Sequence, residues 1–546
     1  MNIPHLISIV IFLPILGAVL TMLVRGENQV KWTALATTSL TFLLSIGLYL
    51  GFDPSVSTAT APQLADISSS WFPDRFDIKY FVGVDGLNLL LIMLTTLLGP
   101  IVVLSSWTYI GKQHKAYYAL LLILQTRVTG VFAAYDNFLF YVFFELTLIP
   151  MYFIIGIWGG ENRIYAAVKF VIYTLVGSLL MLVAIIYLGY AAGAVVNGGV
   201  FTADWYKLVD FAMPLEMQGW LFLLFALAFA IKVPLFPLHT WLPDAHVQAP
   251  TGGSVILAGV LLKMGTYGLV RFCLPFFPNA AHEYGMLFAV LAVIGIVYGA
   301  LVSRAQTDAK KLVAYSSVSH LGFVVLGIFA FTAEAMQGAV IQMINHGIST
   351  GALFLIVGML YERRHTRNMA DFGGIAKSVP VLSFFMIFTV LASAGLPGLN
   401  GFVGEFLILI GAFASESLAS PVLVAVATSG VILAAVYLLY MVYHTFWGTL
   451  ELEENRTMKD LNGRELGLLM PLAALMLIMG IAPTPFLEKS EPMVNHLLGK
   501  IEAKRMLVEA RDTVVPADER IEAVPYTFAL PADEALQTTP TESLLD

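Results

Sequence analysis

The chain has one cysteine, Cys273, among 546 residues. A single thiolate cannot hold an iron–sulfur cluster or a zinc–cysteine site, and it has no partner for an intrachain disulfide. The sequence also lacks the GxGxxG, P-loop and HExxH patterns, which bind dinucleotides, nucleoside triphosphates and catalytic zinc. We therefore expect neither a cofactor nor a metal ion in this chain.

Charge is scarce as well. Only 12% of the residues are charged and 58% are hydrophobic, whereas a soluble protein has about 25% charged residues. This composition indicates a polytopic membrane protein. The net charge of −8 is mostly local, because residues 501–546 hold 10 acids and 4 bases. The charges, prolines and threonines of the tail after Pro485 predict a partly disordered extension.

Long apolar runs dominate the sequence. Fourteen of them have the roughly 20 residues needed to cross a bilayer, and they predict an all-α polytopic membrane fold with about 14 transmembrane helices. The first lacks the basic start and cleavage site of a signal peptide, so we expect it to be retained. The runs fall near residues 3–24, 31–51, 83–107, 116–134, 137–157, 165–191, 219–246, 251–275, 284–302, 312–331, 336–360, 379–414, 421–447 and 466–485.

Basic residues are distributed unevenly between the connecting loops. One set of alternate loops holds fifteen Lys and Arg residues, whereas the other set holds four before the last run. The positive-inside rule assigns the basic set to the cytoplasm. We therefore predict a protein of the bacterial cytoplasmic (inner) membrane, with both termini and the acidic 52–82 loop in the periplasm.

Two runs, the seventh and the twelfth, are interrupted in a similar way. Proline removes a backbone donor and breaks a helix, and discontinuous membrane helices often hold transported ions near the midplane. The seventh run carries Lys232 with Pro234 and Pro237, and the twelfth carries Pro397 and Gly398 ahead of Glu405.

The two interruptions suggest an internal repeat. If each is the fourth helix of a five-helix unit, the second unit enters the membrane from the opposite side and the two units are inverted repeats. The predicted organisation is an N-terminal three-helix segment at 1–110, a first repeat at 111–278, an inverted second repeat at 279–450, a last span at 451–490 and an acidic extension at 491–546.

Six ionisable residues lie at similar depth in separate runs. A lone charge in the bilayer costs roughly 2.5–3.5 kcal/mol on insertion scales, so such groups must pair, titrate or contact water. Nearby opposite charges favour ionisation and burial opposes it, so a balanced group can exchange a proton. The candidate relay residues are Glu145, Lys232, Lys263, His320, His346 and Glu405.

Glu145–Lys232 and Lys263–Glu405 are the candidate pairs within this set. The alternative for each member is a structural contact between helices with no part in transport.

Secondary candidates surround the relay residues. His239, Asp244 and His246 follow the first break, and we expect them to cap the helix or lie in the next loop, with proton uptake as the alternative. His444, near the end of the thirteenth run, is expected to be interfacial or to take up or release protons. Arg127 lies deep in the fourth run, and either pairs with Glu145 or extends toward the interface.

Five segments carry specific motifs: Phe-Glu-Leu at 144–146, Lys-Val-Pro-Leu-Phe-Pro-Leu-His-Thr-Trp-Leu-Pro-Asp-Ala-His at 232–246, Lys-Met-Gly-Thr-Tyr-Gly at 263–268, Tyr-Ser-Ser-Val-Ser-His-Leu-Gly at 315–322 and Asn-His-Gly at 345–347. Over roughly residues 1–490 the chain resembles the antiporter-like membrane subunits of respiratory complex I, which are related to Mrp-type cation/proton antiporter subunits. Glu405 resembles the chain-M (subunit 4) type, because chains L and N usually have lysine there. The lack of a long lateral helix after the last run also argues against chain L.

The resemblance implies one proton channel, with Glu145 and Lys232 as a modulating pair and Lys263, His320 and His346 leading to Glu405. It implies that NAD, FMN, iron–sulfur clusters and quinone belong to other subunits of the NADH:quinone oxidoreductase. The expected partners are its membrane and hydrophilic subunits, including neighbouring antiporter-like subunits, and lipids, with no nucleic acid. The alternatives are a multi-chain Na⁺/H⁺ antiporter, a membrane-bound hydrogenase and a scaffold that has lost transport.

Overall fold

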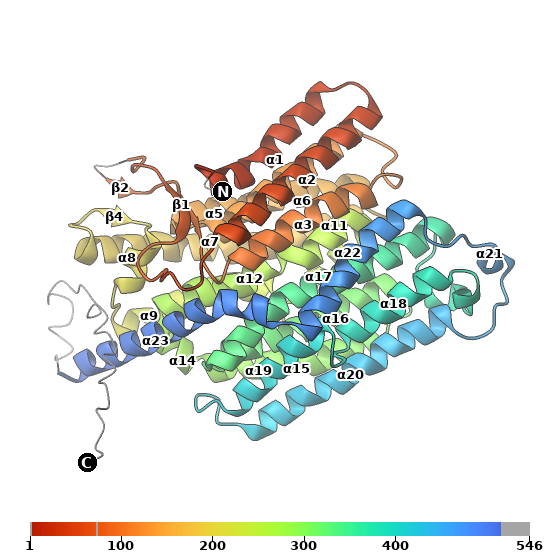
Figure 1. Ribbon diagram of the computed structural model, residues 1–546. Coiled ribbons are helices and arrows are strands. Elements are labelled where there is room, and N and C mark those ends of the chain that lie inside the picture. The colour runs from red at the N-terminus through yellow and green to blue at the C-terminus, as the bar shows by residue number, and fades with distance from the viewer. Residues whose placement is uncertain (1–2, 73–74, 515–546) are drawn as a thin grey trace, which may run out of the picture.

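The computed structural model describes residues 3–72 and 75–514, which form mainly long helices in one bundle (Figure 1). Within these ranges twelve helical segments are long and apolar enough to cross a membrane, and three shorter apolar helices accompany them. The long segments are α1 (Leu6–Leu23), α2 (Glu27–Gly51), α4 (His114–Ala133), α5 with α6 (Asn137–Leu146 and Leu148–Trp158), α7 (Arg163–Val196), α9 (Leu215–Lys232), Thr251–Phe276, α15 (Gly285–Arg304), α16 (Ala309–Ile328), α17 (Ala333–Arg364), α20 (Pro421–Phe446) and α22 (Gly463–Ile481), and the shorter ones are α3 (Leu89–Ser105), α18 (Pro380–Ser393) and α19 (Asn400–Phe413).

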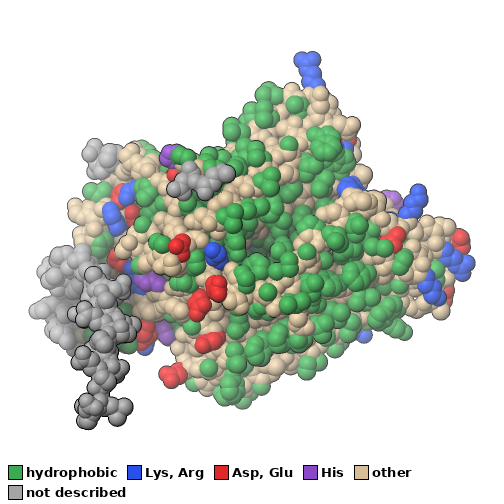
Figure 2. Space-filling model, viewed as in Figure 1, with side chains coloured by type: hydrophobic (Ala, Val, Ile, Leu, Met, Phe, Trp, Pro, Cys, Tyr) green, Lys and Arg blue, Asp and Glu red, His purple; other side chains and the backbone are tan. Residues whose placement is uncertain are grey.

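The outer surface of the bundle is apolar around its middle. Large hydrophobic side chains such as Leu43, Ile172 and Ile432 are exposed on α2, α7 and α20. Figure 2 shows hydrophobic side chains across the middle of one face, with charged groups mainly toward its ends. A helix that is apolar all round is stable only inside protein or lipid. Thr251–Phe276 and α17, in contrast, are buried along their apolar length and form the centre of the bundle.

In the described part of the chain four short strands form, and they lie at one end of the bundle, which we call the strand-bearing end (Figure 1). β1 (Gln63–Ile67) pairs antiparallel with β3 (Phe81–Val84), and β2 (Phe76–Asp77) pairs parallel with β4 (Phe201–Thr202). The expectation of an all-α fold is therefore wrong for this end, because the 52–82 loop satisfies part of its backbone by strand pairing. The short helices α8 (Trp205–Asp210) and α14 (Pro278–Glu283) complete this end.

Asp77 ties two segments together at the strand-bearing end. Its carboxylate lies 2.8 Å from Lys207 Nζ and 3.2 Å from Lys79 Nζ. Burial acts to raise the pKa of Asp77, but the two ammonium groups outweigh burial and hold the pKa below its usual range. The opposite end of the bundle carries α21 (Glu453–Arg456) and the 3-10 turns η3 (Met369–Asp371) and η4 (Ile375–Lys377).

A long helix, α23 (Thr484–Val514), follows α22 and runs toward the strand-bearing end (Figure 1). The composition of the tail predicts partial disorder, yet residues up to Val514 are helical, because apolar side chains such as Val494 and Leu497 are buried. Residues 515–546 lie outside the described part. The expectation that no long helix follows the last run is wrong, so the argument against chain L that rested on it does not hold.

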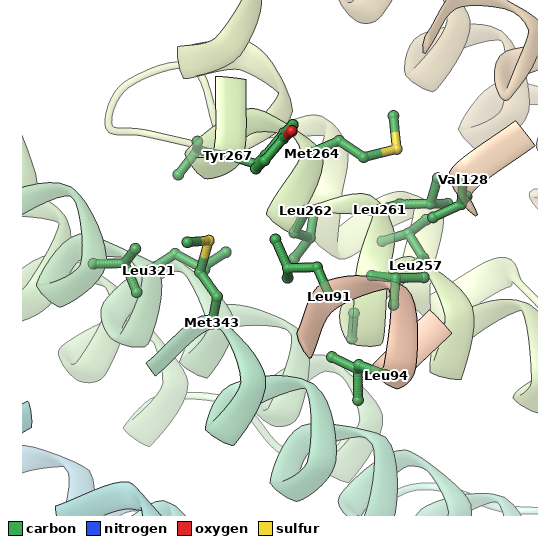
Figure 3. Close-up of a cluster of buried hydrophobic side chains, with 14 of the residues drawn as sticks. Leu91, Leu94, Val128, Leu257, Leu261, Leu262, Met264, Tyr267, Leu321 and Met343 are labelled. Atoms are coloured by element: carbon green, nitrogen blue, oxygen red, sulfur yellow. The ribbon is translucent and has the colours of Figure 1, made fainter. Parts of the chain in front are cut away.

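The core of the bundle surrounds Thr251–Phe276. This segment comprises α11 (Thr251–Ile256), the π-helical turn η1 (Leu257–Leu261), α12 (Lys263–Gly268), a second π-helical turn η2 (Leu269–Cys273) and α13 (Leu274–Phe276). Its apolar side chains pack with those of α3, α4, α16 and α17 (Figure 3). A polar group inside this packing needs an internal partner, because no solvent replaces the hydrogen bonds it has lost.

The two predicted helix interruptions are confirmed. α9 ends at Lys232, and residues 233–240, with Pro234 and Pro237, separate it from α10 (Trp241–Gln248). Residues 394–399, with Pro397 and Gly398, separate α18 from α19. Gly395 and Gly398 have φ values of 75° and 90°, a conformation that glycine adopts without the steric cost of a Cβ atom.

Candidate functional site

Lys263 lies at the centre of the bundle, on the first residue of α12 between the two π-helical turns. Its Nζ lies 2.6 Å from His346 Nδ1 of α17 and also donates to the carbonyl oxygen of Ala258. A π-helical turn shifts the backbone hydrogen-bond register, and here the carbonyl five residues before Lys263 accepts from its side chain. Both Lys263 and His346 are buried.

A second histidine continues the series. The ring centroids of His346 and His320 are 5.8 Å apart, and His320 Nδ1 lies 2.9 Å from Glu405 Oε1. The hydroxyl of Tyr437 lies 3.1 Å from His320 Nε2. The order is therefore Lys263, His346, His320, Glu405. The candidate pairing of Lys263 with Glu405 is corrected, because two imidazoles stand between them.

Glu405 is held at the second helix interruption. Gln342 Nε2 donates to Glu405 Oε1 at 3.1 Å, and Asn345 Nδ2 donates to Gln342 Oε1 at 3.2 Å and to Asn400 O at 2.7 Å. The Cα of Gly395 faces the carboxylate so closely that an added Cβ would lie 3.0 Å from Glu405 Oε2. The interruption thus folds around the carboxylate and ties it to α17.

The spacing of Gln342, Asn345 and His346 could have predicted that they share one face of a helix, since residues three and four apart do so. Gln342 and Tyr437 were nevertheless not predicted from the sequence as partners of the series. A polar stripe within an apolar run was the signal for Gln342; the lone Tyr437 gave none.

Lys232 is buried at the end of α9 without a hydrogen-bonding partner on its Nζ. The ammonium lies 5.2 Å from the ring of Phe144 and 5.3 Å from the ring of Phe170, which gives it cation–π contacts. Glu145 is the residue after Phe144, and its Oε2 has no hydrogen-bonding partner. Glu145 and Lys232 are close enough to act on each other electrostatically. The predicted pair is nevertheless not in contact, because the ammonium of Lys232 has no hydrogen-bonding partner in the described chain.

The end of α9 lies directly against α12. An added Cβ on Gly265 would come within 2.8 Å of the carbonyl oxygen of Phe229 and of the backbone nitrogen of Val233. Only a residue without a side chain allows this approach. The close contact brings the backbone that carries Lys232 next to the turn that carries Lys263.

His246 is not in a loop, contrary to the preferred interpretation of its position. It lies in α10, fully buried, with its ring stacked at 4.6 Å on the ring of Phe354 and with neither ring nitrogen hydrogen-bonded. Lys310 and Lys263 are both among the charges that act on it. α10 continues the broken span into the bundle, so its histidine faces the core instead of solvent.

Lys310 is a further residue of interest that was not predicted from the sequence, where it served only as one of the fifteen basic loop residues that set the orientation. Its buried Nζ donates to the carbonyl oxygen of Ala249 at 2.5 Å. It lines a polar cavity of about 490 Å³ at the end of the bundle opposite the strands, where Arg367 and Asp308 form an ion pair at 3.3 Å. A buried lysine therefore stands on the wall of the cavity, at the start of the helix that carries His320.

The other candidates lie away from this series. Asp244 pairs with Lys169 at 2.7 Å. His239 lies in the turn segment between α9 and α10, as expected, but is buried there against Phe236 and Tyr298. His444 is exposed beside Tyr440, and Arg127 is half-buried without an ion pair in the described chain. The suggested Arg127–Glu145 pair is therefore absent.

The series has the chemistry of a proton relay. An imidazole can accept a proton on one nitrogen while it donates from the other, and a lysine or glutamate at each end can store the charge. The contacts of 2.6 Å and 2.9 Å at its ends are within hydrogen-bonding distance.

Comparison with known proteins gives a family match over more than half of the chain. Residues 134–433, which contain all six candidate relay residues, match the family described as NADH:quinone oxidoreductase/Mrp antiporter, TM. The chain is 44% identical over 516 residues to NADH-quinone oxidoreductase subunit M of Rhodobacter capsulatus, which covers 90% of this chain and 96% of that protein.

Two solved structures share the fold over nearly the whole chain. A chain of respiratory complex I from Thermus thermophilus with bound NADH aligns with a TM-score of 0.79 and 34% identity, over 92% of this chain and 99% of that one. A chain of the Mrp complex from Dietzia sp. aligns with a TM-score of 0.77 over 92% and 100%, and its 18% identity shows the fold alone.

Proposed function

The chain belongs to the NADH:quinone oxidoreductase/Mrp antiporter membrane family, among the M subunits of NADH-quinone oxidoreductase, and on this premise we propose that it translocates protons within respiratory complex I. The observation that carries the proposal is the buried series Lys263–His346–His320–Glu405. Four titratable groups in line, in the two most deeply buried helical segments and their neighbours, exceed what packing alone requires.

In this proposal protons enter from the polar cavity at Lys310 and reach Lys263 by way of His246. From Lys263 they pass through His346 and His320 to Glu405. The 5.8 Å between the two imidazole centroids requires a bridging water or a ring rotation at that step. Tyr437 and Gln342 position His320 and Glu405 through their hydrogen bonds.

Lys232 and Glu145 have a modulating role in this proposal. A buried ammonium with only cation–π contacts is costly, so the approach of Glu145 would favour its charged form. Because α9 contacts α12 at Gly265, a change of charge at Lys232 alters the field at Lys263. One transported charge costs about 2.3 kcal/mol per 100 mV, and we assign the energy source, with NAD, FMN, iron–sulfur clusters and quinone, to the other subunits.

The proposed topology has fourteen spans in the bacterial inner membrane. It adds α3 as a thirteenth span and α18 with α19 as a discontinuous fourteenth to the twelve long segments. The two interruptions then occupy equivalent positions in inverted five-helix repeats, and both termini face the periplasm. The partners in this proposal are neighbouring antiporter-like membrane subunits and the hydrophilic subunits.

Glu145→Gln and Lys232→Ala test the proposal in the purified complex reconstituted into vesicles. We expect electron transfer from NADH to an artificial acceptor to remain largely intact while proton translocation falls. Lys377→Gln, at an exposed position outside the candidate residues, is the control and should leave both unchanged. Wild-type translocation by both relay variants in an intact complex would contradict the proposal. Replacing Na⁺ by K⁺ separates the antiporter alternative, which requires Na⁺ for the proton flux.

A further inference from the structure

An apolar groove opens on the outer surface between α2, α3, α17 and α22. It encloses about 330 Å³ and is lined by residues that include Tyr49, Met93, Leu97, Ile348, Met479 and Phe486. Its residues on α3 extend from Leu90 to Leu97, which is about 10 Å at 1.5 Å per residue. Figure 2 shows a hollow bordered by hydrophobic side chains on this face. The shape and chemistry suit a hydrocarbon chain.

A smaller cavity lies at the strand-bearing end of the groove. It encloses about 170 Å³, and its lining combines apolar side chains such as Val56 and Met493 with the polar Ser55, Thr58, Lys489 and His496. Lys489 stands at the junction of the two hollows, with its Nζ 5.0 Å from the ring centroid of Tyr49 and hydrogen-bonded to the carbonyl oxygen of Phe52 at 3.0 Å. The apolar groove, which suits a hydrocarbon chain, and the cavity at Lys489, which offers partners for a polar group, therefore share one wall.

The charges at this junction have both signs. The Asp53 carboxylate accepts hydrogen bonds from the backbone nitrogen and the hydroxyl of Ser55, a lining residue of the cavity, at 2.9 and 2.7 Å, and Glu488 directly precedes Lys489 in the chain. One ammonium with two carboxylates suits a headgroup with a phosphate and an amine, because the phosphate meets Lys489 and the amine meets a carboxylate. A headgroup with a phosphate and no amine leaves the carboxylates facing a like charge.

We propose that the groove binds one acyl chain of a phosphatidylethanolamine molecule, whose headgroup occupies the cavity at Lys489. The bound chain would complete the wall beside the relay. Ile344 and Ile348 line the groove on the same helix as His346, and the Leu94 side chain packs on Gly347, where an added Cβ would lie 2.5 Å from it. This consequence for the wall rests on the proposed function, whereas lipid binding itself does not.

The test uses the whole purified complex and a phosphatidylethanolamine probe with a photoreactive group in one acyl chain. We expect adducts on peptides that contain α3 and α22 to exceed those on α20 several-fold. Met93→Trp fills the groove and should reduce these adducts several-fold, whereas Ile432→Trp, at an exposed position of α20, should not. Unlabelled phosphatidylethanolamine competing on the unmodified complex gives the same information without relying on a variant.

The headgroup is tested separately with the same probe. Lys489→Gln should weaken labelling several-fold and the exposed Lys377→Gln should not. Equal competition by phosphatidylglycerol would overturn the assignment of the headgroup. Adducts spread evenly over the exposed helices, or crosslinks from Met93→Cys to a helix of a neighbouring subunit that covers the groove, would overturn the lipid site itself.

Discussion

The substitution Lys263→Met should impair proton translocation while leaving the stability of the protein nearly unchanged. Methionine keeps an unbranched apolar stem but removes the donor to His346 Nδ1 and to the carbonyl oxygen of Ala258. Each acceptor left unpaired in the core costs about 1–3 kcal/mol. Removing a fully buried ammonium relieves a desolvation penalty of several kcal/mol. Because the two effects oppose each other and are of similar size, Lys263→Met should assemble.

Transport should respond differently. Without Lys263 no titratable side chain links His246 to His346, so a proton would have to cross an apolar region. We expect at least tenfold slower translocation, which corresponds to about 1.4 kcal/mol of added barrier. The assay is proton uptake per NADH oxidised by vesicles that contain the purified complex, with electron transfer to an artificial acceptor as the measure of assembled enzyme.

Lys504 provides a matched control, because it is also a buried lysine bonded to carbonyl oxygens. Its Nζ donates to Val209, Pro275 and Phe276 at 3.0, 3.0 and 3.3 Å, at the strand-bearing end and away from the series. Lys504→Met relieves the same desolvation penalty but leaves three acceptors unpaired instead of two, at about 1–3 kcal/mol each. It should therefore lower stability more than Lys263→Met, with normal uptake per NADH in the enzyme that assembles. Normal uptake by Lys263→Met, or an equal loss in both variants, would refute the relay.

Three further variants probe other parts of the structure. Asp85→Asn leaves Arg271 buried without its 2.6 Å ion pair, so about 3–5 kcal/mol of stability should be lost, seen as a lower unfolding temperature of the complex. Gly395→Ala forces a positive φ at about 1–2 kcal/mol and crowds Glu405, so translocation should slow while assembly persists; unchanged pumping would argue against a constrained carboxylate. Lys310→Met should slow proton uptake, measured as a shallower dependence of pumping rate on cytoplasmic-side pH, and an unaltered profile would exclude this route.

The two helix interruptions were predictable because proline and glycine act locally. Pro234 lacks a backbone donor wherever it stands, and a Pro-Gly pair at 397–398 ends a helix before any tertiary contact forms. The depth of each ionisable residue in the membrane was equally predictable, since it follows from the position of that residue in its apolar run. These features follow from the chain alone.

The order of the relay residues was not predictable. His320 and Glu405 are 85 positions apart, and their contact depends on how α16 and α19 rotate against each other. The same holds for His246, whose burial depends on α10 turning back into the bundle. The strands at 63–84 were missed because each is only two to five residues long, and because the partner of β2 lies in a distant loop at 201–202.

The irregular backbone explains why the polar groups lie where they do. A regular helix in lipid satisfies all its own backbone groups and offers none to a side chain. Each end of the series departs from that rule. At one end, the carbonyl oxygen of Ala258 in η1 accepts from Lys263. At the other end, the carbonyl oxygen of Asn400, directly after the turn at 394–399, accepts from Asn345, which also donates to Gln342 and so orients Gln342 toward Glu405. The interruption after Lys232 differs, since its ammonium gains no acceptor. Of the three irregular sites, that one holds the least satisfied charge, and it is therefore the site where a small movement of Glu145 should change protonation most.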